Sequence, residues 1–208
     1  MANSKNFISG KIGNVVYFER GGKQLIREHV VPKDPQTPAQ LTQRMKLSLA
    51  NKGLKPLKEI IKEGCKNDKN AYRSLVGLTM KENIIGEYPN LYIDYSKLKI
   101  VEGRLQLPSY VQIEIDTKSD LANIRWNTHN NSTLRYGTEN DIVKIVCLNI
   151  KYLTAYHVST HKIRSEGSAS ITLPKDWQPK DIHFWMYLTS HDMQHNSDSV
   201  YIVNSRMK

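Results

Sequence analysis

From Leu105 to its C-terminus, the chain is a series of short segments in which apolar and polar residues tend to alternate. Alternation of this kind is typical of strands that turn one face to a core. Turn residues separate the segments, which are YVQIEI, LANIRW, DIVKIVCLNI, TAYHVST, SASITL, IHFWMYL and SVYIV. Seven closely spaced strands predict an antiparallel β-sandwich of the immunoglobulin or fibronectin type III class. Trp126 and Tyr187 are expected to be core or near-core aromatics of this sandwich.

The N-terminal part predicts a β-hairpin. NVVYFER and KQLIREHVV flank Gly21-Gly22, and glycines supply the positive φ angles that a tight primed turn requires. Counting from the turn pairs Phe18 with Leu25 and Tyr17 with Ile26, so both faces of the ribbon are apolar. One face can pack on this chain, and the other is predicted to contact a partner. The predicted assembly contact consists of Val15, Tyr17, Phe18, Leu25 and Ile26.

Three short helices are expected after the hairpin. Thr37 and Gln40 fit a capping box around Pro38, which suits a first helical position, and this helix should run to Gly53. The segment 54–64 predicts a second helix that stops at Gly64, and the segment 67–83 predicts a third. The hairpin and helices would form a small α+β module.

The two halves of the chain differ in charge. Residues 1–107 contain 19 Lys and Arg against 10 Asp and Glu, a net charge of +9, whereas residues 108–208 contain 11 against 10, a net charge of +1. Helical patterning also stops just before the strand pattern begins. The sequence therefore predicts two domains, an α+β module over residues 1–106 and a β-sandwich over residues 107–208.

These segments resemble a family of proteins of unknown function found mainly in Bacteroidota and their mobile elements. The family more often has Asn-Pro at the Asp34-Pro35 turn, and no activity comes with the resemblance. The chain also resembles, more loosely, the small virion proteins of gut (crAss-like) phages that form stacked tail rings. The matching residues are Gly10 to Val16, Gly22-Lys23-Gln24, Arg27, Asp34 to Gln40, Gln43-Arg44 and Ser197 to Tyr201.

The predicted helices are basic. Their cations recur mostly three or four residues apart, so several could line one side and neutralise phosphates. No helix-turn-helix, zinc-finger or RNP-type motif accompanies them, and a solvated surface or an acidic protein partner explains the same pattern. Nucleic acid thus remains an alternative partner. The candidate contacts with an anionic partner are Arg44, Lys55, Lys58, Lys62, Lys66 and Lys69.

No pattern in the sequence predicts catalysis, a metal site or a cofactor. His191 and His195 are four residues apart in a loop-like segment, where that spacing does not bring two ligands together. Cys147 lies in an apolar strand, and Cys65, beside Gly64 and Lys66, has no catalytic partner in view. Phosphate-loop and nucleophile-elbow motifs are lacking. An enzyme of unrecognised type remains a third hypothesis beside assembly and nucleic-acid binding.

The expected function is that of a non-enzymatic structural protein. It would form homo-oligomers, bind other assembly proteins, and belong to a virion, with a phage tail ring or connector as the most specific expectation. The N-terminus lacks the apolar run of a signal peptide, and no apolar run is long enough to enter a membrane. A cytoplasmic or virion location is therefore expected.

Overall fold

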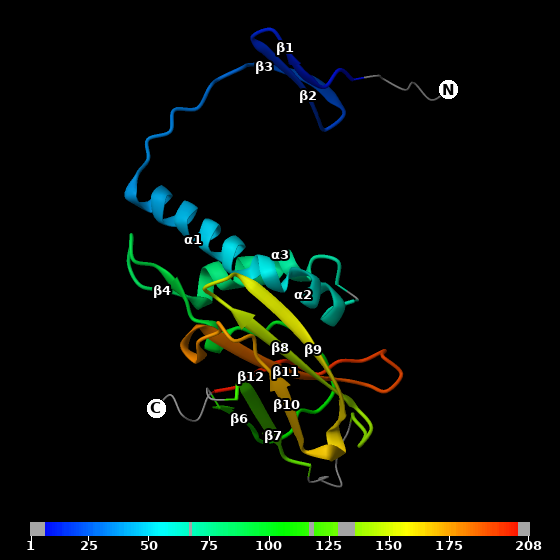
Figure 1. Ribbon diagram of the computed structural model, residues 1–208. Helices are drawn as coiled ribbons and strands as arrows, with labels where there is room; N and C mark the ends of the chain where they lie inside the picture. Colours follow the sequence, from blue (N-terminus) through cyan, green and yellow to red (C-terminus); the bar gives the residue numbers. More distant parts are fainter. Residues whose placement is uncertain (1–6, 67, 117–118, 129–135, 204–208) are drawn as a thin grey trace, which may run out of the picture. The chain divides into compact units, whose positions relative to one another are not determined.

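The protein is described by a computed structural model that covers residues 7–66, 68–116, 119–128 and 136–203. The chain divides into two compact units, Met1–Pro38 and Ala39–Lys208, each of which is treated by itself (Figure 1). The first unit is a small β-sheet. The second contains the helices, the larger sheets and both hydrophobic cores.

The first unit is a three-stranded sheet in the order β1-β2-β3, built from β1 Gly10–Ile12, β2 Val15–Arg20 and β3 Lys23–Glu28. The predicted turn is confirmed, because Gly21 and Gly22 have φ angles of +62° and +71°, which residues with a side chain rarely adopt. The predicted pairs Phe18 with Leu25 and Tyr17 with Ile26 are confirmed too. The sequence prediction lacks β1, because three residues carry too little periodicity to reveal a strand.

The helices of the second unit largely follow the prediction. The first begins at Pro38 and ends one residue beyond Gly53, while capping by Thr37 and Gln40 stays a prediction. The predicted second helix begins with a 3₁₀ turn and ends at Gly64 as predicted, and the third begins later than predicted. No helix in the described part of the chain is long and apolar enough to cross a membrane. The helical elements are α1 Pro38–Leu54, η1 Lys55–Leu57, α2 Lys58–Gly64, α3 Ala71–Leu78 and the π-helical η2 Thr79–Asn83.

The seven predicted strands are all present. They form a three-stranded sheet in the order β10-β7-β6 and a four-stranded sheet in the order β12-β11-β8-β9, with neighbours antiparallel. The chain changes sheets after β7, after β9 and after β10, which is the strand order of an immunoglobulin-like sandwich. The strands are β6 Val111–Asp116, β7 Leu121–Trp126, β8 Ile142–Asn149, β9 Thr154–Ile163, β10 Ser168–Thr172, β11 Ile182–Thr189 and β12 Val200–Tyr201.

The two sheets share one hydrophobic core. Ile113 and Ile124 come from the three-stranded sheet, and Ile145, Phe184 and Met186 come from the four-stranded sheet. All five are almost completely buried. The predicted β-sandwich is therefore confirmed.

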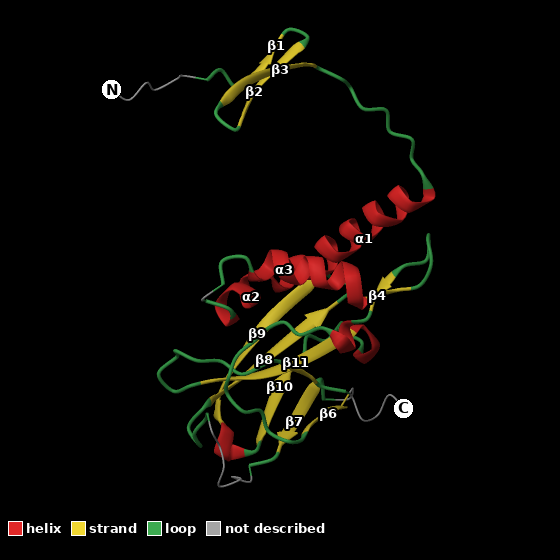
Figure 2. Cartoon of the chain, turned by 180° about the vertical axis from the view of Figure 1, so that it is seen from behind, coloured by secondary structure: helices red, strands yellow, loops and turns green. Residues whose placement is uncertain are grey.

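The four-stranded sheet is buried on its other face as well. Along β8 and β11, alternation turns Val146, Leu148, Trp185 and Tyr187 away from the sandwich core and into a second core shared with the helices. Figure 1 shows α2 and α3 on one side of β8, β9 and β11, with β6 and β7 on the other side, and Figure 2 shows the same layers from behind. The second unit is thus built as helices, a four-stranded sheet and a three-stranded sheet.

One of the two predicted core aromatics lies on a different face than expected. Trp126 is in the sandwich core, and its indole N–H donates to the Arg164 carbonyl at 2.7 Å. Tyr187 is buried, but it lies in the core under the helices. Its place in the sandwich core is taken by its neighbours Met186 and Leu188, because successive strand residues point to opposite faces.

The predicted division at residues 106/107 needs correction. Leu54, Leu57 and Ile61 from the helices share one core with Val146 and Trp185 from the sheet. The helices therefore belong to the same compact unit as the sandwich, and the chain divides at Pro38.

The connection from the helices to β6 is held by the C-terminal segment Ser197 to Ser199. The Ser199 hydroxyl accepts from the amides of Ile100 and Val101 at 2.8 and 3.1 Å. Asp198 binds the Lys99 ammonium at 2.8 Å and accepts from the Gly103 amide at 3.1 Å. The remaining elements of this unit are β4 Ile84–Ile85, β5 Tyr92–Ile93, η3 Tyr95–Lys97, η4 Arg164–Glu166 and η5 Pro179–Asp181.

Truncated fragments test whether the chain divides at Pro38 or at residues 106/107. A fragment of residues 39–208 should unfold in one cooperative transition, because it keeps both cores. A fragment of residues 107–208 exposes Trp185 and Tyr187, so it should aggregate or bind a hydrophobic dye such as ANS. Circular dichroism and dye fluorescence measure both outcomes. A monomeric, cooperatively folded 107–208 fragment would contradict the shared core.

Candidate assembly surface

The N-terminal sheet has no core of its own. None of the described residues of the first unit, 7–38, is buried. An isolated two-stranded hairpin is marginally stable at best in water, and a third strand or packing against a helix is needed for independent stability. Here the third strand, β1, is only three residues long. The described part of the first unit provides no further layer to pack on the sheet.

The predicted contact residues lie together in this sheet, but on opposite faces. Leu25 and Ile26 are 38% and 60% exposed, and Val15, Tyr17 and Phe18 are half-buried. Tyr17 is directly opposite Ile26, and Phe18 is directly opposite Leu25. Residues that pair directly share a face, and successive residues alternate, so the sheet has two apolar patches.

The face that carries Tyr17, called the Tyr17 face, also includes Ile12, Val15 and Ile26. Ile12 is 59% exposed and pairs with Val15. The sequence prediction omits Ile12 because it omits β1. The signal that could have found both is Gly13-Asn14, which is a turn between GKI and VVYFER.

The opposite face, called the Phe18 face, has Val16, Phe18 and Leu25 as its apolar residues. The Arg27 guanidinium lies 5.8 Å from the centre of the Phe18 ring, within the range of a cation–π contact. This contact covers part of the aromatic ring and leaves Leu25 exposed.

Gln24 fixes the segment that precedes β1. Its side-chain oxygen accepts from the Ile8 amide at 2.8 Å, and its side-chain nitrogen donates to the Ile8 carbonyl at 2.9 Å. The same nitrogen also donates to the Phe18 carbonyl at 3.2 Å. One amide side chain thus replaces ladder hydrogen bonds, which gives the sheet a defined shape without a core.

The six predicted anionic-partner residues are all exposed, but they do not lie on one helix. Lys58 and Lys62 are in α2, Lys55 is in η1, and Lys66 and Lys69 follow the end of α2. A spacing of three or four aligns side chains only along a continuous helix. Pro56 lies in the 3₁₀ turn η1 that precedes α2, and α2 ends at Gly64, so Lys66 and Lys69 lie outside it. The predicted single line is therefore broken. Arg44 belongs to α1.

The second unit also has a cavity of about 740 Å³ between α2, α3 and the segments 99–104 and 194–196. Apolar side chains such as Ile61 and Leu75 line it together with Lys66, Lys99 and Arg104. Cys65 is at its wall, where burial raises the pKa of the thiol. A raised pKa reduces the thiolate that nucleophilic chemistry needs.

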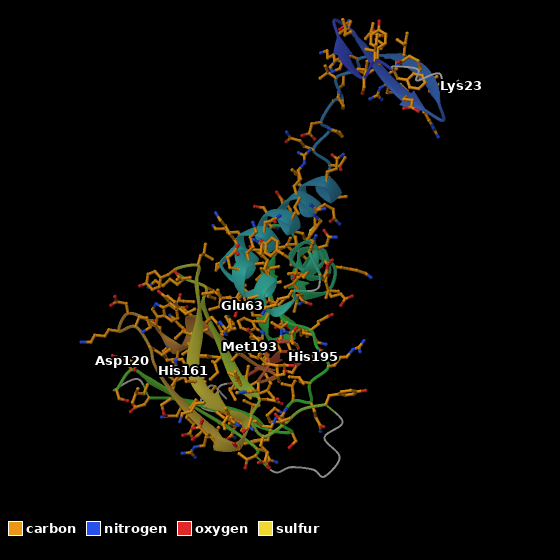
Figure 3. All side chains as sticks on the ribbon, turned by 90° about the vertical axis from the view of Figure 1, so that its right-hand side faces the viewer. Lys23, Glu63, Asp120, His161, Met193 and His195 are labelled. Atoms are coloured by element: carbon orange, nitrogen blue, oxygen red, sulfur yellow. The ribbon has the colours of Figure 1, made fainter. Side chains whose placement is uncertain are left out.

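His157 connects a helix to the sheet. Its Nδ1 is 3.7 Å from a Glu63 carboxylate oxygen, and its Nε2 is 3.4 Å from the Tyr187 hydroxyl. Burial lowers the pKa of His157 and raises that of Tyr187. Glu63, which faces His157 from α2, is labelled in Figure 3. Within the described residues, no three His, Cys, Asp or Glu side chains gather in a way that could hold a metal ion.

His183 predicts how stability depends on pH. Burial beside Tyr95 and Tyr201 lowers its pKa from 6.5 to about 4, partly opposed by Asp94. The unfolded chain takes up this proton near pH 6.5 and the folded chain does not, so stability should fall between about pH 6.5 and 4. The loss attributable to His183 should be on the order of 1–3 kcal/mol.

Urea unfolding at a series of pH values checks this prediction. His183→Asn keeps a polar atom facing the Tyr201 hydroxyl, which is 2.9 Å from the His183 Nδ1, and removes the titration. Its stability should therefore fall less steeply over the same pH range. The pKa of His157 is lowered as well, so part of the slope should remain. Identical slopes for the two proteins would refute the assignment.

A coreless N-terminal sheet, joined to a layered unit with an immunoglobulin-like sandwich, defines a multi-unit protein with an exposed apolar surface. Residues 7–203 match the Family of unknown function (DUF6266). Because the match spans most of the chain, the protein belongs to this family. The resemblance to a family of unknown function is confirmed. No curated protein sequence matches the chain.

Two solved structures show partial likeness to the chain. For an Fn3-like protein from Clostridium thermocellum, the match covers 50% of this chain and 97% of that protein, at 11% identity and a TM-score of 0.31. For pectate lyase Pel3 from Pectobacterium carotovorum, the match covers 47% of this chain and 28% of that protein, at 10% identity and a TM-score of 0.26. Scores this low carry no functional argument, and the sandwich assignment rests on the strand order above.

Proposed function

We propose that the protein is a non-enzymatic structural component that assembles through its N-terminal sheet with copies of itself and with other assembly proteins. One observation carries the proposal: the sheet has exposed apolar residues on two faces, and none of its described residues is buried. Burial of such side chains contributes roughly 25 cal/mol per Å². A neighbouring subunit would supply the missing layer.

The outer edges of the sheet support the same proposal. β1 and β3 each pair with β2 on one side only, so each leaves a row of backbone groups for another strand. Strand addition supplies main-chain hydrogen bonds as well as apolar contact. β3 is six residues long, which is long enough to serve as a template.

The most specific form of the proposal is a virion component, such as a ring or connector in a phage tail. The segment 29–37 has no helix or strand and joins the sheet to the second unit. Val30 and Val31 within it are strongly exposed. A short sheet joined to the second unit by a segment without helix or strand suits a subunit that contacts its neighbours in a repeated array.

No chemical step is part of this proposal. Burial raises the pKa of both thiols, Cys65 and Cys147, which disfavours a nucleophilic role. His157, Glu63 and Tyr187 connect α2 to the sheet, and this gives their contacts a structural explanation.

Replacing Ile26 tests the proposal. Ile26→Asp places a charge in the apolar patch, so the full-length chain should dissociate while the second unit keeps its fold. Tyr92→Asp is the matched control, because Tyr92 also lies on a strand and is 57% exposed against 60% for Ile26. Light scattering coupled to gel filtration measures the mass. Unchanged assembly of Ile26→Asp would refute the proposed contact, as would a wild-type chain that stays monomeric with its genomic partners present.

Nucleic-acid binding is the second candidate function, favoured by the exposure of all six basic residues. Reversal of Lys58, Lys62 and Lys66 to Glu should then abolish retention on DNA or RNA, and wild-type binding should weaken steeply with salt. Filter binding at two salt concentrations measures both effects. Absence of wild-type retention at low salt would eliminate this candidate.

A further inference from the structure

The two faces of the N-terminal sheet carry opposite charges. On the Tyr17 face the charged residues are Glu19 and Glu28, and no Lys or Arg is present. The Phe18 face has four cations and no Asp or Glu. The cations are Lys11, Arg20, Lys23 and Arg27.

The charges also have matching positions. On the Phe18 face, Arg20 and Lys23 form one row, Lys11 and Arg27 form another, and the pair Phe18 with Leu25 lies between them. On the Tyr17 face, Glu19 and Glu28 similarly lie on either side of the pair Tyr17 with Ile26. Each face therefore has an apolar centre between two charged ends.

These charges have no partners of opposite sign within the sheet. None of the six forms an ion pair in the described part of the chain. Arg20 and Lys23 are directly opposite each other in the ladder, an arrangement that destabilises a strand pair. An anionic surface laid over the Phe18 face would remove this repulsion.

We propose that copies of this chain stack head to tail, with the Tyr17 face of one sheet against the Phe18 face of the next. This inference rests on the proposed function and names the partner and the polarity of the contact. In this arrangement the apolar centre of one sheet covers the apolar centre of the next, and the glutamates of one sheet lie against the cations of the next. A symmetric contact would instead place like charges together. A head-to-tail contact builds a ring if it closes and a filament if it does not.

Two reversed variants of the full chain test the polarity by sedimentation velocity at low ionic strength. The first, acid-reversed, is Glu19→Lys with Glu28→Lys. The second, base-reversed, changes the four cations of the Phe18 face to Glu. The control changes four exposed lysines of the second unit to Glu, the same number of substitutions as in the base-reversed variant. They are Lys52, Lys81, Lys175 and Lys180.

Each reversed variant alone should associate about tenfold or more weakly than the wild type, because like charges then meet in every contact. A 1:1 mixture should regain association, since each chain then offers a complementary face to the other. The control should associate like the wild type. Added salt should weaken the wild-type contact through screening.

Other outcomes overturn the inference. If only one of the two reversals weakens association, the Tyr17 face does not pair with the Phe18 face, and the proposed polarity is wrong. If neither does while Ile26→Asp still dissociates the chain, the proposed function stands and the polarity is wrong. A wild-type chain that never associates would refute both the proposed function and the polarity of the contact. If wild-type monomer instead binds single-stranded DNA, and the base-reversed variant alone loses that binding, the Phe18 face is a nucleic-acid site.

Discussion

Burial of the four-stranded sheet on both faces is the interaction on which the second unit depends. Along β8, Ile145 and Cys147 enter the sandwich core while Val146 and Leu148 enter the core under the helices. Along β11, Met186 enters the sandwich core and Trp185 enters the core under the helices. One pair of strands therefore joins the helices to the sandwich, and neither layer is complete without it. Ser199 and Asp198, which precede β12, accept hydrogen bonds from the segment 99–103 and so tie the chain between the layers to the C-terminal part of the sheet.

The N-terminal sheet has the same two-sided apolar pattern without the covering layers. Val15 to Phe18 in β2 are apolar at successive positions, as Ile145 to Leu148 in β8 and Phe184 to Leu188 in β11 are. In the second unit the covering layers come from the same chain, whereas the described part of the first unit has none. Since apolar surface on this scale is costly in water, we infer that the cover comes from another subunit. The segregation of glutamates and cations to opposite faces gives that contact a direction.

Local signals in the sequence predicted the local structure well. The turn at Gly21-Gly22, the helix start at Pro38 and all seven sandwich strands depend on neighbouring residues, and the structure has each of them. The domain boundary failed because it depends on long-range burial. Near-continuous apolar runs such as IHFWMYL are typical of strands covered on both faces, and this signal indicated a layer beyond the sandwich. The single basic line is interrupted where α2 ends at Gly64, before Lys66 and Lys69. The apolar residues of the two faces were predicted except for Ile12, whose strand is only three residues long, and Val16.

The central claim is that a neighbouring subunit completes the N-terminal sheet. Amide hydrogen exchange on the full-length chain, measured at low and at high protein concentration, tests it most directly. We predict that the amides of β2 and β3 exchange fast in dilute solution and become protected at high concentration, while β8 and β11 are protected at both. Strong protection of β2 and β3 in the dilute monomer, or fast exchange at both concentrations, would contradict the account.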